Sequence, residues 1–401
     1  MRLKEAPVKP THRIDLLDIY RGFAVFGIFV VNIVIMNSTF LNQDEFALQW
    51  TSTLDVLAEK ILQLFFYTKF FPIFSLLFGL GISMQALKMM GENRLSFSFF
   101  GRRMLILFVI GWLHILFLWS GDVVHLYAIL GLFTTLLIKA SNKIILGLSA
   151  FFLLLPFQEQ FLFYILDLIK FQPHTYLKGY TGANVHEIIS NGSYLAGVRL
   201  RVLEYASNVP MLYGFLAPIA ASMFLLGLYL GKTKVYQQPK IFLQKIQGVM
   251  IWIAIITNLY RLVFLFVLVQ HELFASSFYR EIFIKLMVVS DVAVGLFYLW
   301  VIGKLYYYTR LKKLFLPLRY VGRMALTNYI IQSFLGLLIF SSLGFQLYEK
   351  LSPMQAIVMA ILVFIAQVVM SKIWLTYYRF GPLEWVWRCL TYKKLLQLKK
   401  V

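Results

Sequence analysis

Apolar runs of roughly 20 residues recur along the chain between short polar segments, and this pattern constrains the fold most strongly. A run of that length matches an α-helix that crosses the hydrocarbon core of a bilayer. The mean hydropathy is +0.75, and only 14% of the 401 residues are charged, whereas soluble domains carry about a quarter. Segments of about ten residues in which apolar and polar residues alternate do not recur along the chain, so a transmembrane β-barrel is disfavoured. The sequence therefore predicts an all-α, polytopic transmembrane helical bundle.

The apolar runs predict about ten spans. Their expected positions are roughly residues 17–37, 61–87, 104–120, 122–139, 143–168, 210–231, 247–270, 284–306, 325–347 and 354–378. Pro156 and the polar residues after it predict that the fifth span is kinked or ends early. We divide the chain into an N-terminal half, 1–209, and a C-terminal half, 210–401. The polar segment 169–209 is expected to be an outer loop with one short interfacial helix.

The basic residues indicate how the bundle is oriented. The net charge is +20, and the basic pairs 102–103, 312–313 and 393–394 fall on one side of the predicted bundle. By the positive-inside rule, this side and both termini are cytoplasmic. The same residues favour anionic lipid headgroups, so the charge requires no nucleic acid. A homo-oligomer remains open. The single cysteine, Cys389, excludes an internal disulfide, and no residue spacing is typical of a metal site.

The first span carries two polar residues, Arg21 and Asn32. Eleven residues of α-helix turn about 1100° and rise about 16 Å, so both side chains lie on one face. Arg21 is expected near the cytoplasmic interface and Asn32 in the outer third of the span. Either residue could serve packing alone, Arg21 as an interfacial anchor and Asn32 as a hydrogen-bond partner of another helix.

Other polar residues are expected to share one depth in the outer half of the membrane. A charge in hydrocarbon costs about 2.5 to 3.5 kcal/mol, so such groups face one another or a wet cavity. One interpretation is two buried ion pairs that fix helix registry. The other is an outward-facing site for a polar substrate. The residues of this layer are Lys69, His114, Asp122, His125, Arg261 and Asp291, together with Asn32 and Asn258.

His114 and His125 are the candidate bases of this layer. His125 follows Asp122 by one helical turn, and a carboxylate at that spacing orients an imidazole and raises its basicity. Either histidine could equally be hydrogen-bonded to a neighbouring helix without any catalytic role.

A second group of candidates lies on the cytoplasmic side. Arg21, Arg319 and Arg323 could form a pocket for an anionic donor such as acyl-coenzyme A. The segment that starts at Pro382 predicts a short amphipathic helix in which Arg388 pairs with Glu384. That helix could also act only as a clamp on the membrane surface.

Five segments in order resemble the YeiB family of bacterial multi-pass membrane proteins, which carry a carboxy-terminal domain of unknown function (domain 418). The segments are "LDIYRGFAVFGIFVVNI", "FPIFSLLFGLGISMQ", "GWLHILFLWSGDVVHLYAILG", "YVGRMALTNYIIQS" and "GPLEWVWRCLTY". The resemblance implies a bacterial cell-membrane protein and brings no settled activity.

The first two segments also resemble, more distantly, transmembrane acyltransferases of the heparan-glucosaminide N-acetyltransferase and O-antigen acetylase type. In that group an arginine-glycine is followed, eleven residues after the arginine, by Asn or His, and here these positions are Arg21, Gly22 and Asn32. A histidine at the last position is thought to act as the base. Asn32 cannot take up a proton, so a base would have to come from elsewhere.

Two functions are therefore carried forward. In acyl transfer, the arginines hold acyl-coenzyme A at the inner face, His114 or His125 deprotonates an acceptor hydroxyl or amine at the outer face, and Asn32 stabilises the oxyanion. In proton-coupled transport, Lys69 and Arg261 bind a small anionic or zwitterionic solute and Asp291 carries the proton.

Overall fold

The apolar runs fold into helices throughout the part of the chain that the structure describes. The structure is a computed structural model that describes residues 14–39 and 41–400, the side chain of Asp44 excepted. Within those residues the only strand-like pairing is an isolated bridge between Tyr378 and Lys399. The predicted all-α helical bundle is confirmed. The terminal residues 1–13 and 401 lie outside the described residues.

Within the described residues, seven helical segments are long and apolar enough to cross a membrane. They are α1 (Asp15–Asn37), the continuous segment Thr53–Gly91, α5 (Phe97–Phe117), Met211–Lys232, Gln247–Gln270, α14 (Ser277–Tyr308) and α18 (Pro353–Tyr377). Three of these segments join several elements. Their parts are α3 (Thr53–Ile61), η2 (Leu62–Phe66) and α4 (Phe70–Gly91); η5 (Met211–Leu216) and α11 (Ala217–Lys232); and α13 (Gln247–Phe266) and η7 (Leu268–Gln270).

The remaining three expected spans are broken or short. α7 (Asn142–Leu154) and α8 (Gln158–Leu168) meet at 86°, beside Pro156 and the left-handed Phe157, which confirms the expected break in the fifth span. A second bent pair, at 81°, joins Lys312–Arg323 to α17 (Ala325–Phe340) and was not expected. Its first part contains α15 (Lys312–Phe315) and α16 (Leu318–Arg323). α6 (Val124–Leu136) with η3 (Leu137–Lys139) is the short fourth span.

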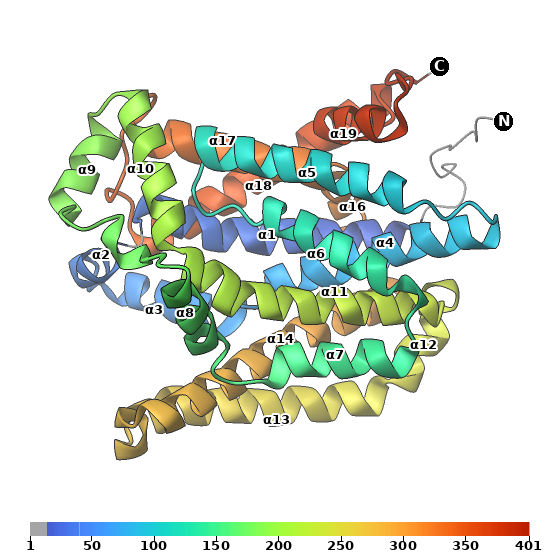
Figure 1. Cartoon of the computed structure of the whole chain (residues 1–401), viewed down its shortest axis with the longest axis horizontal. Helices are drawn as coiled ribbons and strands as arrows, with labels where there is room; N and C mark the ends of the chain where they lie inside the picture. The colour runs from blue at the N-terminus through green and yellow to red at the C-terminus, as the bar shows by residue number, and fades with distance from the viewer. Residues whose placement is uncertain (1–13, 40, 401) are drawn as a thin grey trace.

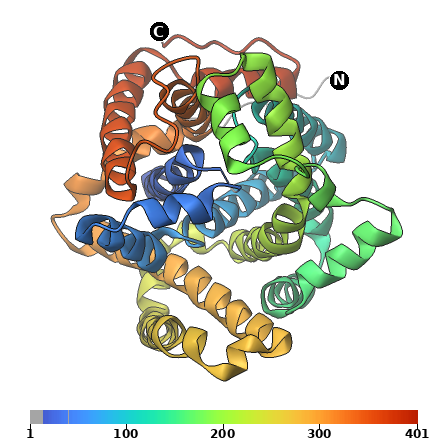
Figure 2. The same ribbon diagram turned by 90° about the vertical axis from the view of Figure 1, so that its left-hand side faces the viewer.

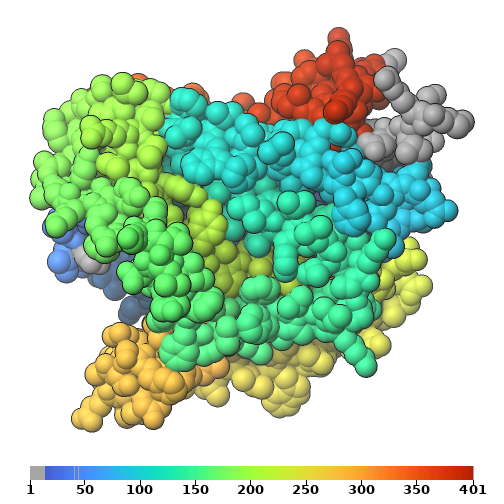
Figure 3. Space-filling view, viewed as in Figure 1, coloured from blue at the N-terminus to red at the C-terminus, as the bar shows by residue number. Residues whose placement is uncertain are grey.

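The segment 169–209 is more ordered than expected. It contains two helices, α9 (Gly182–Ser190) and α10 (Tyr194–Ser207), instead of one, and both begin at hydroxyl N-caps, Thr181 and Ser193. Small elements complete the chain: α2 (Gln43–Gln49), η4 (Pro173–Thr175), η6 (Val235–Gln237), α12 (Pro239–Lys245), η8 (Glu272–Ala275) and α19 (Pro382–Tyr392). In Figure 3, the segment that contains α9 and α10 covers one end of the molecule.

The long helices run roughly along the long axis of the molecule and define two ends (Figure 1). We call them the α10 end, where α9 and α10 lie, and the α19 end, where α12 and α19 lie. The start of α1 also lies at the α19 end, since Arg319 pairs with Asp15 there. Viewed from the α10 end, α13 and α14 form one edge of the molecule and α7 and α8 form another (Figure 2).

Close packing of two helices joins the two halves of the sequence. α11 lies against α4, and a Cβ added at Gly79 or Gly227 would stand 2.2 Å from a backbone oxygen of the other helix. Glycine is required at both positions because any side chain would separate the helices. One hydrophobic core contains residues from both sides of position 209, such as Leu77 and Phe224.

Candidate functional site

A large cavity lies at the α19 end and has a volume of about 1440 Å³. This exceeds the roughly 300–1,000 Å³ that is usual for a small-molecule site. It reaches the surface at the exposed residues Lys88 and Glu92. Among the described residues its charged lining is strongly basic: eight Lys or Arg (Arg21, Lys88, Arg94, Arg103, Arg323, Arg379, Arg388 and Lys400) against three acids (Asp18, Glu92 and Glu384). We call it the basic cavity.

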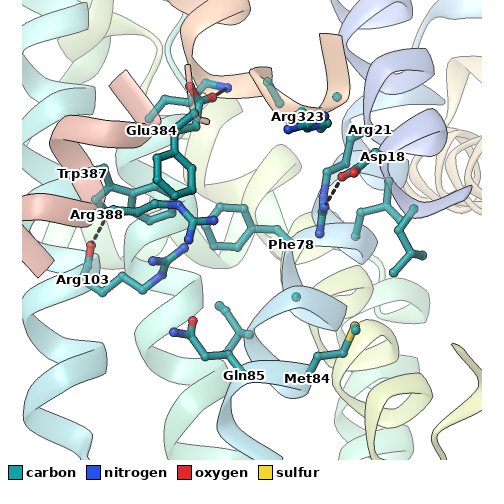
Figure 4. Close-up of a pocket in the computed structure, with 18 of the residues that line it drawn as sticks. Asp18, Arg21, Phe78, Met84, Gln85, Arg103, Arg323, Glu384, Trp387 and Arg388 are labelled. Carbon is teal, nitrogen blue, oxygen red and sulfur yellow. Dashed lines mark hydrogen bonds and ion pairs between the residues drawn. The ribbon is translucent and has the colours of Figure 1, made fainter. Parts of the chain in front are cut away.

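Contacts across several helices hold the arginines of the basic cavity in place (Figure 4). The Arg21 guanidinium on α1 donates to buried Asp18 at 3.0 Å. On α5, the guanidinium of Arg103 lies 3.8 Å from the centre of the Trp387 ring. The Trp387 indole in turn donates to the backbone oxygen of Arg103 at 2.8 Å. These contacts fix α19 across the mouth of the cavity, so its arginine Arg388 also lines it.

Glu384 secures α19 to the broken helix. Its carboxylate accepts from the backbone N–H groups of Leu326 and Thr327 at 2.8 and 3.1 Å, and from the Thr327 hydroxyl at 2.6 Å. These are the unpaired donors of the first turn of α17. Burial raises the pKa of Glu384. The sequence predicted that Arg388 can pair with Glu384, whereas the hydrogen bonds described for the Glu384 side chain come from α17.

Farther from the α19 end, the lining of the basic cavity becomes apolar and aromatic. Val25 and Ile28 of α1, Phe74 of α4, and Val124 of α6 contribute to it, as does Tyr329 of α17. A cavity with a cationic mouth and an apolar interior matches an anionic amphiphile in shape and polarity.

Behind this apolar end lies a cluster of two histidines and a carboxylate. Nδ1 of His114 lies 2.9 Å from Oδ1 of Asp122, and Nδ1 of His125 lies 2.9 Å from Oδ2 of the same residue. All three side chains are buried. The ring of Tyr329, which lines the cavity, lies 5.3 Å from the His114 ring. The structure thus brings together the two histidines that the sequence suggested as bases and Asp122, the carboxylate expected to orient them.

The two histidines differ in their second ring nitrogen. Nε2 of His125 lies 3.1 Å from the hydroxyl of Tyr205, which lies 3.1 Å from that of Tyr213. Nε2 of His114 is buried and has no hydrogen-bond partner among the residues that the structure describes. A neutral imidazole whose Nδ1 faces a carboxylate presents a basic Nε2. His114 is therefore the better placed candidate base.

A second, smaller cavity lies at the α10 end, with a volume of about 80 Å³. Its lining includes Trp119, Arg201, Glu204 and Ser333. The Ser120 hydroxyl donates to the buried Glu204 carboxylate at 2.8 Å. Burial raises the pKa of Glu204 to about 7, so this carboxyl can act as donor or acceptor near neutral pH. We call this the outer cavity.

The two cavities lie end to end along the same three helices. On α1, Val25 and Ile28 line the basic cavity and Met36 lines the outer cavity. On α5, Arg103 and Leu107 line the basic cavity, and Leu118, just after the helix, lines the outer cavity. On α17, Ala325 and Tyr329 line the basic cavity, and Ser333 and Gly336 line the outer cavity. His114 lies between the two parts of α5, four residues before Leu118. Asn32 follows Ile28 by one turn of α1 and so lies between the cavities on the same face. The half-buried Asn32 lines neither cavity.

The other charged residues of the predicted layer form a separate ion cluster. Oδ1 of Asp291 forms ion pairs with Nζ of Lys69 and with Nε of Arg261, each at 2.8 Å. Lys69 also donates to the backbone oxygens of Gln63 and Tyr67, and Arg261 donates to Leu64 O. These carbonyls belong to η2 and to Tyr67 just after it, next to the break before α4, where Thr68 has a φ of 61°. The two cations therefore complete the backbone hydrogen bonding of a broken helix.

Two further candidates lie outside both cavities. Arg319 pairs with Asp15 at 2.9 Å and with the Tyr320 hydroxyl, and it does not line the basic cavity. Asn258 accepts from Arg261 at 2.9 Å and belongs to the ion cluster. Of the expected donor pocket, Arg21 and Arg323 line the basic cavity.

Several residues that line the two cavities were not among the candidates that the sequence suggested. Arg201 and Glu204 lie one helical turn apart on α10, in a segment expected to be mostly loop. Arg103 was noticed only as part of a cytoplasmic basic pair. The spacing of Arg201 and Glu204, three residues apart in segment 169–209, is the feature of the sequence that could have indicated the outer cavity.

Comparison with known proteins agrees with the family resemblance. The family described as "Protein of unknown function (DUF418)" matches residues 230–394. The "Uncharacterized protein YxaH" of Bacillus subtilis is 29% identical over 96% of both chains. The "Uncharacterized protein YeiB" of Escherichia coli is 27% identical over 94% of this chain and 95% of its own. No solved structure matches this chain.

Proposed function

We propose a function for this chain from the geometry of its cavities. The chain matches the DUF418 family over residues 230–394 and is similar to YeiB over nearly its whole length. It is a transmembrane acyltransferase that takes an acyl group from acyl-coenzyme A on the cytoplasmic side and transfers it to an acceptor hydroxyl. One observation carries the proposal: a cavity with a mouth lined by arginines extends to an apolar end next to the cluster of His114, Asp122 and His125.

The arginines at the mouth suit the phosphates of coenzyme A. Arg21, Arg323, Arg103 and Arg388 come from four different helices, so their fork-shaped donors can meet several phosphate oxygens at once. The apolar end suits the acyl chain. By the positive-inside rule, the basic α19 end faces the cytoplasm, where acyl-coenzyme A is available.

In the transfer step, the acceptor oxygen forms a bond to the carbonyl carbon of the thioester. Nε2 of His114 takes the proton of the acceptor hydroxyl, the carbon–sulfur bond breaks, and the thiolate of coenzyme A leaves. Asp122 holds the His114 ring and stabilises its protonated form. His114 does not line the basic cavity, whereas Tyr329 lines it and its ring lies 5.3 Å from that of His114. Transfer therefore requires the Tyr329 side chain to move. Asn32, on the same face of α1, is positioned to donate to the carbonyl oxygen once the two cavities connect.

The test is coenzyme A binding to the purified full chain. Arg21→Gln and Arg323→Gln should each weaken binding about tenfold or more, because each removes a charged donor to phosphate. Arg319→Gln is the matched control, since Arg319 lies at the same end but outside the cavity. The proposal fails if the wild type does not bind coenzyme A, or if Arg319→Gln weakens binding as much as the other two.

Proton-coupled transport is the second candidate. The two cavities at opposite ends of the bundle favour it, because alternating exposure of one site needs a closed layer between them. The residues first suggested for the solute, Lys69, Arg261 and Asp291, line neither cavity. His114, Asp122 and His125 line neither cavity as well, but His114 lies between the two along α5, so a solute that passes from one cavity to the other would contact the histidine cluster instead. Uptake of a labelled solute into proteoliposomes without acyl transfer would favour this candidate.

A further inference from the structure

The outer cavity contains two charged side chains that are removed from solvent. Arg201 is 9% exposed and Glu204 is 6% exposed. Both residues lie on α10, which covers the end of the bundle opposite the basic cavity. Burial of charged groups is costly, and such groups are usually fully paired in a protein interior.

The guanidinium of Arg201 is only partly paired. Its Nε donates to the backbone oxygen of Leu116 at 3.1 Å, and the ring of Tyr194 lies 5.3 Å from its central carbon. Its Nη2 is buried and has no hydrogen-bond partner among the described residues. A buried donor without a partner is destabilising, because the loss of its hydrogen bonds to water is not compensated. The cavity that Arg201 lines is the place where a ligand oxygen could accept this hydrogen bond.

The outer cavity favours a neutral ligand with hydroxyl groups. One Arg and one Glu give it no net charge when both are ionised, and Thr39, Ser193 and Ser333 add hydroxyl groups to its lining. Trp119 supplies an apolar, aromatic wall. With a volume of about 80 Å³, the cavity has room for only the tip of a larger molecule.

We propose that the outer cavity is the acceptor subsite, and that the acceptor is a neutral molecule bearing three or more hydroxyl groups. Arg201 donates to one hydroxyl oxygen and Glu204 accepts from another, so a third group of the acceptor points along α5 and α17 towards His114. This inference rests on the proposed acyl transfer, because it gives the transferred group its destination.

The experiment measures occupation of the outer cavity without any donor. The full chain in nanodiscs, in a Cys389→Ser background, carries Leu343→Cys at the exposed rim of the cavity. A hydrophilic maleimide labels that position, and glycerol or glucose is added as the neutral probe. We expect the probe to slow labelling. A parallel Leu195→Cys variant, exposed on α10 but outside the cavity, should be labelled at the same rate with and without probe.

Substitutions in the cavity test which residues bind the probe. Arg201→Gln and Glu204→Gln should each raise the probe concentration needed for protection about tenfold or more. Arg199→Gln, an exposed residue of the same helix, should not. Glucose 6-phosphate should protect less well than glucose, and this comparison in the unsubstituted cavity does not depend on the folding of a variant.

The outcomes separate this inference from the proposed function. Absence of protection by either neutral probe, equal protection by glucose 6-phosphate, or indifference to both cavity substitutions would overturn the acceptor subsite. If coenzyme A binding persists in that case, the proposed function survives. Protection by glucose without coenzyme A binding would show a binding site for neutral polyols in the outer cavity, but it would overturn acyl transfer and with it the role of this cavity as acceptor subsite.

Discussion

At the scale of single residues, the buried charges of this chain serve two different purposes. The cluster of Lys69, Arg261 and Asp291 satisfies backbone carbonyls at a helix break. The cluster of His114, Asp122 and His125 instead leaves one imidazole nitrogen without a partner among the described residues, next to the apolar end of a large cavity. Depth in the predicted membrane could not separate these groups, because the sequence places all six residues at one expected depth.

The ion cluster gives a prediction about stability. Asp291→Leu leaves the buried Lys69 and Arg261 without their carboxylate and should cost about 3–5 kcal/mol. Arg261→Met should also destabilise the protein, and the double variant should cost less than the sum of the two single changes, since they share one interaction. Thermal melts in detergent measure this, with the exposed Glu272→Gln as control. Strict additivity would show that the two side chains are not coupled.

At the scale of elements, hydropathy predicted where the helices lie. Helix-breaking residues predicted some of the positions at which the spans bend. Pro156 indicated the break in the fifth span. The break before α17 has no proline, and its first turn is capped by Glu384 from a helix about 60 residues later. Sequence patterns describe local preferences, so they could not reveal a cap supplied from so far along the chain. The same limit hid the cavities, which are formed by residues from α1, α5 and α17 together.

The contact between α4 and α11 gives a prediction at this scale. A Cβ at Gly227 would stand 2.2 Å from the backbone oxygen of Leu76, so Gly227→Ala should force the helices apart and destabilise the protein by about 1–3 kcal/mol. Gly147 of α7 has open space around its would-be Cβ. Gly147→Ala should therefore leave the melting temperature unchanged or raise it, because alanine favours a helix. Equal effects of the two changes would contradict the close approach.

At the scale of the whole molecule, the chain is a helical bundle with the character of a multi-pass membrane protein and a cavity at each end. The cavities are aligned along three shared helices, with His114 between them. The cytoplasmic location of the basic α19 end stays a prediction from the charge distribution. With that orientation, the donor enters from the cytoplasm and the acceptor from the opposite side, so the reaction moves an acyl group across the membrane.

The most direct test is sided acyl transfer by the full chain in proteoliposomes of one orientation. Labelled acetyl-coenzyme A is supplied at the α19 side and glucose at the α10 side. The account predicts an acetyl ester on glucose at the α10 side, and a rate reduced roughly 100-fold or more in His114→Gln, as expected for loss of a general base, with coenzyme A binding retained. Absence of any ester with the wild type, or full activity in His114→Gln, would contradict the account.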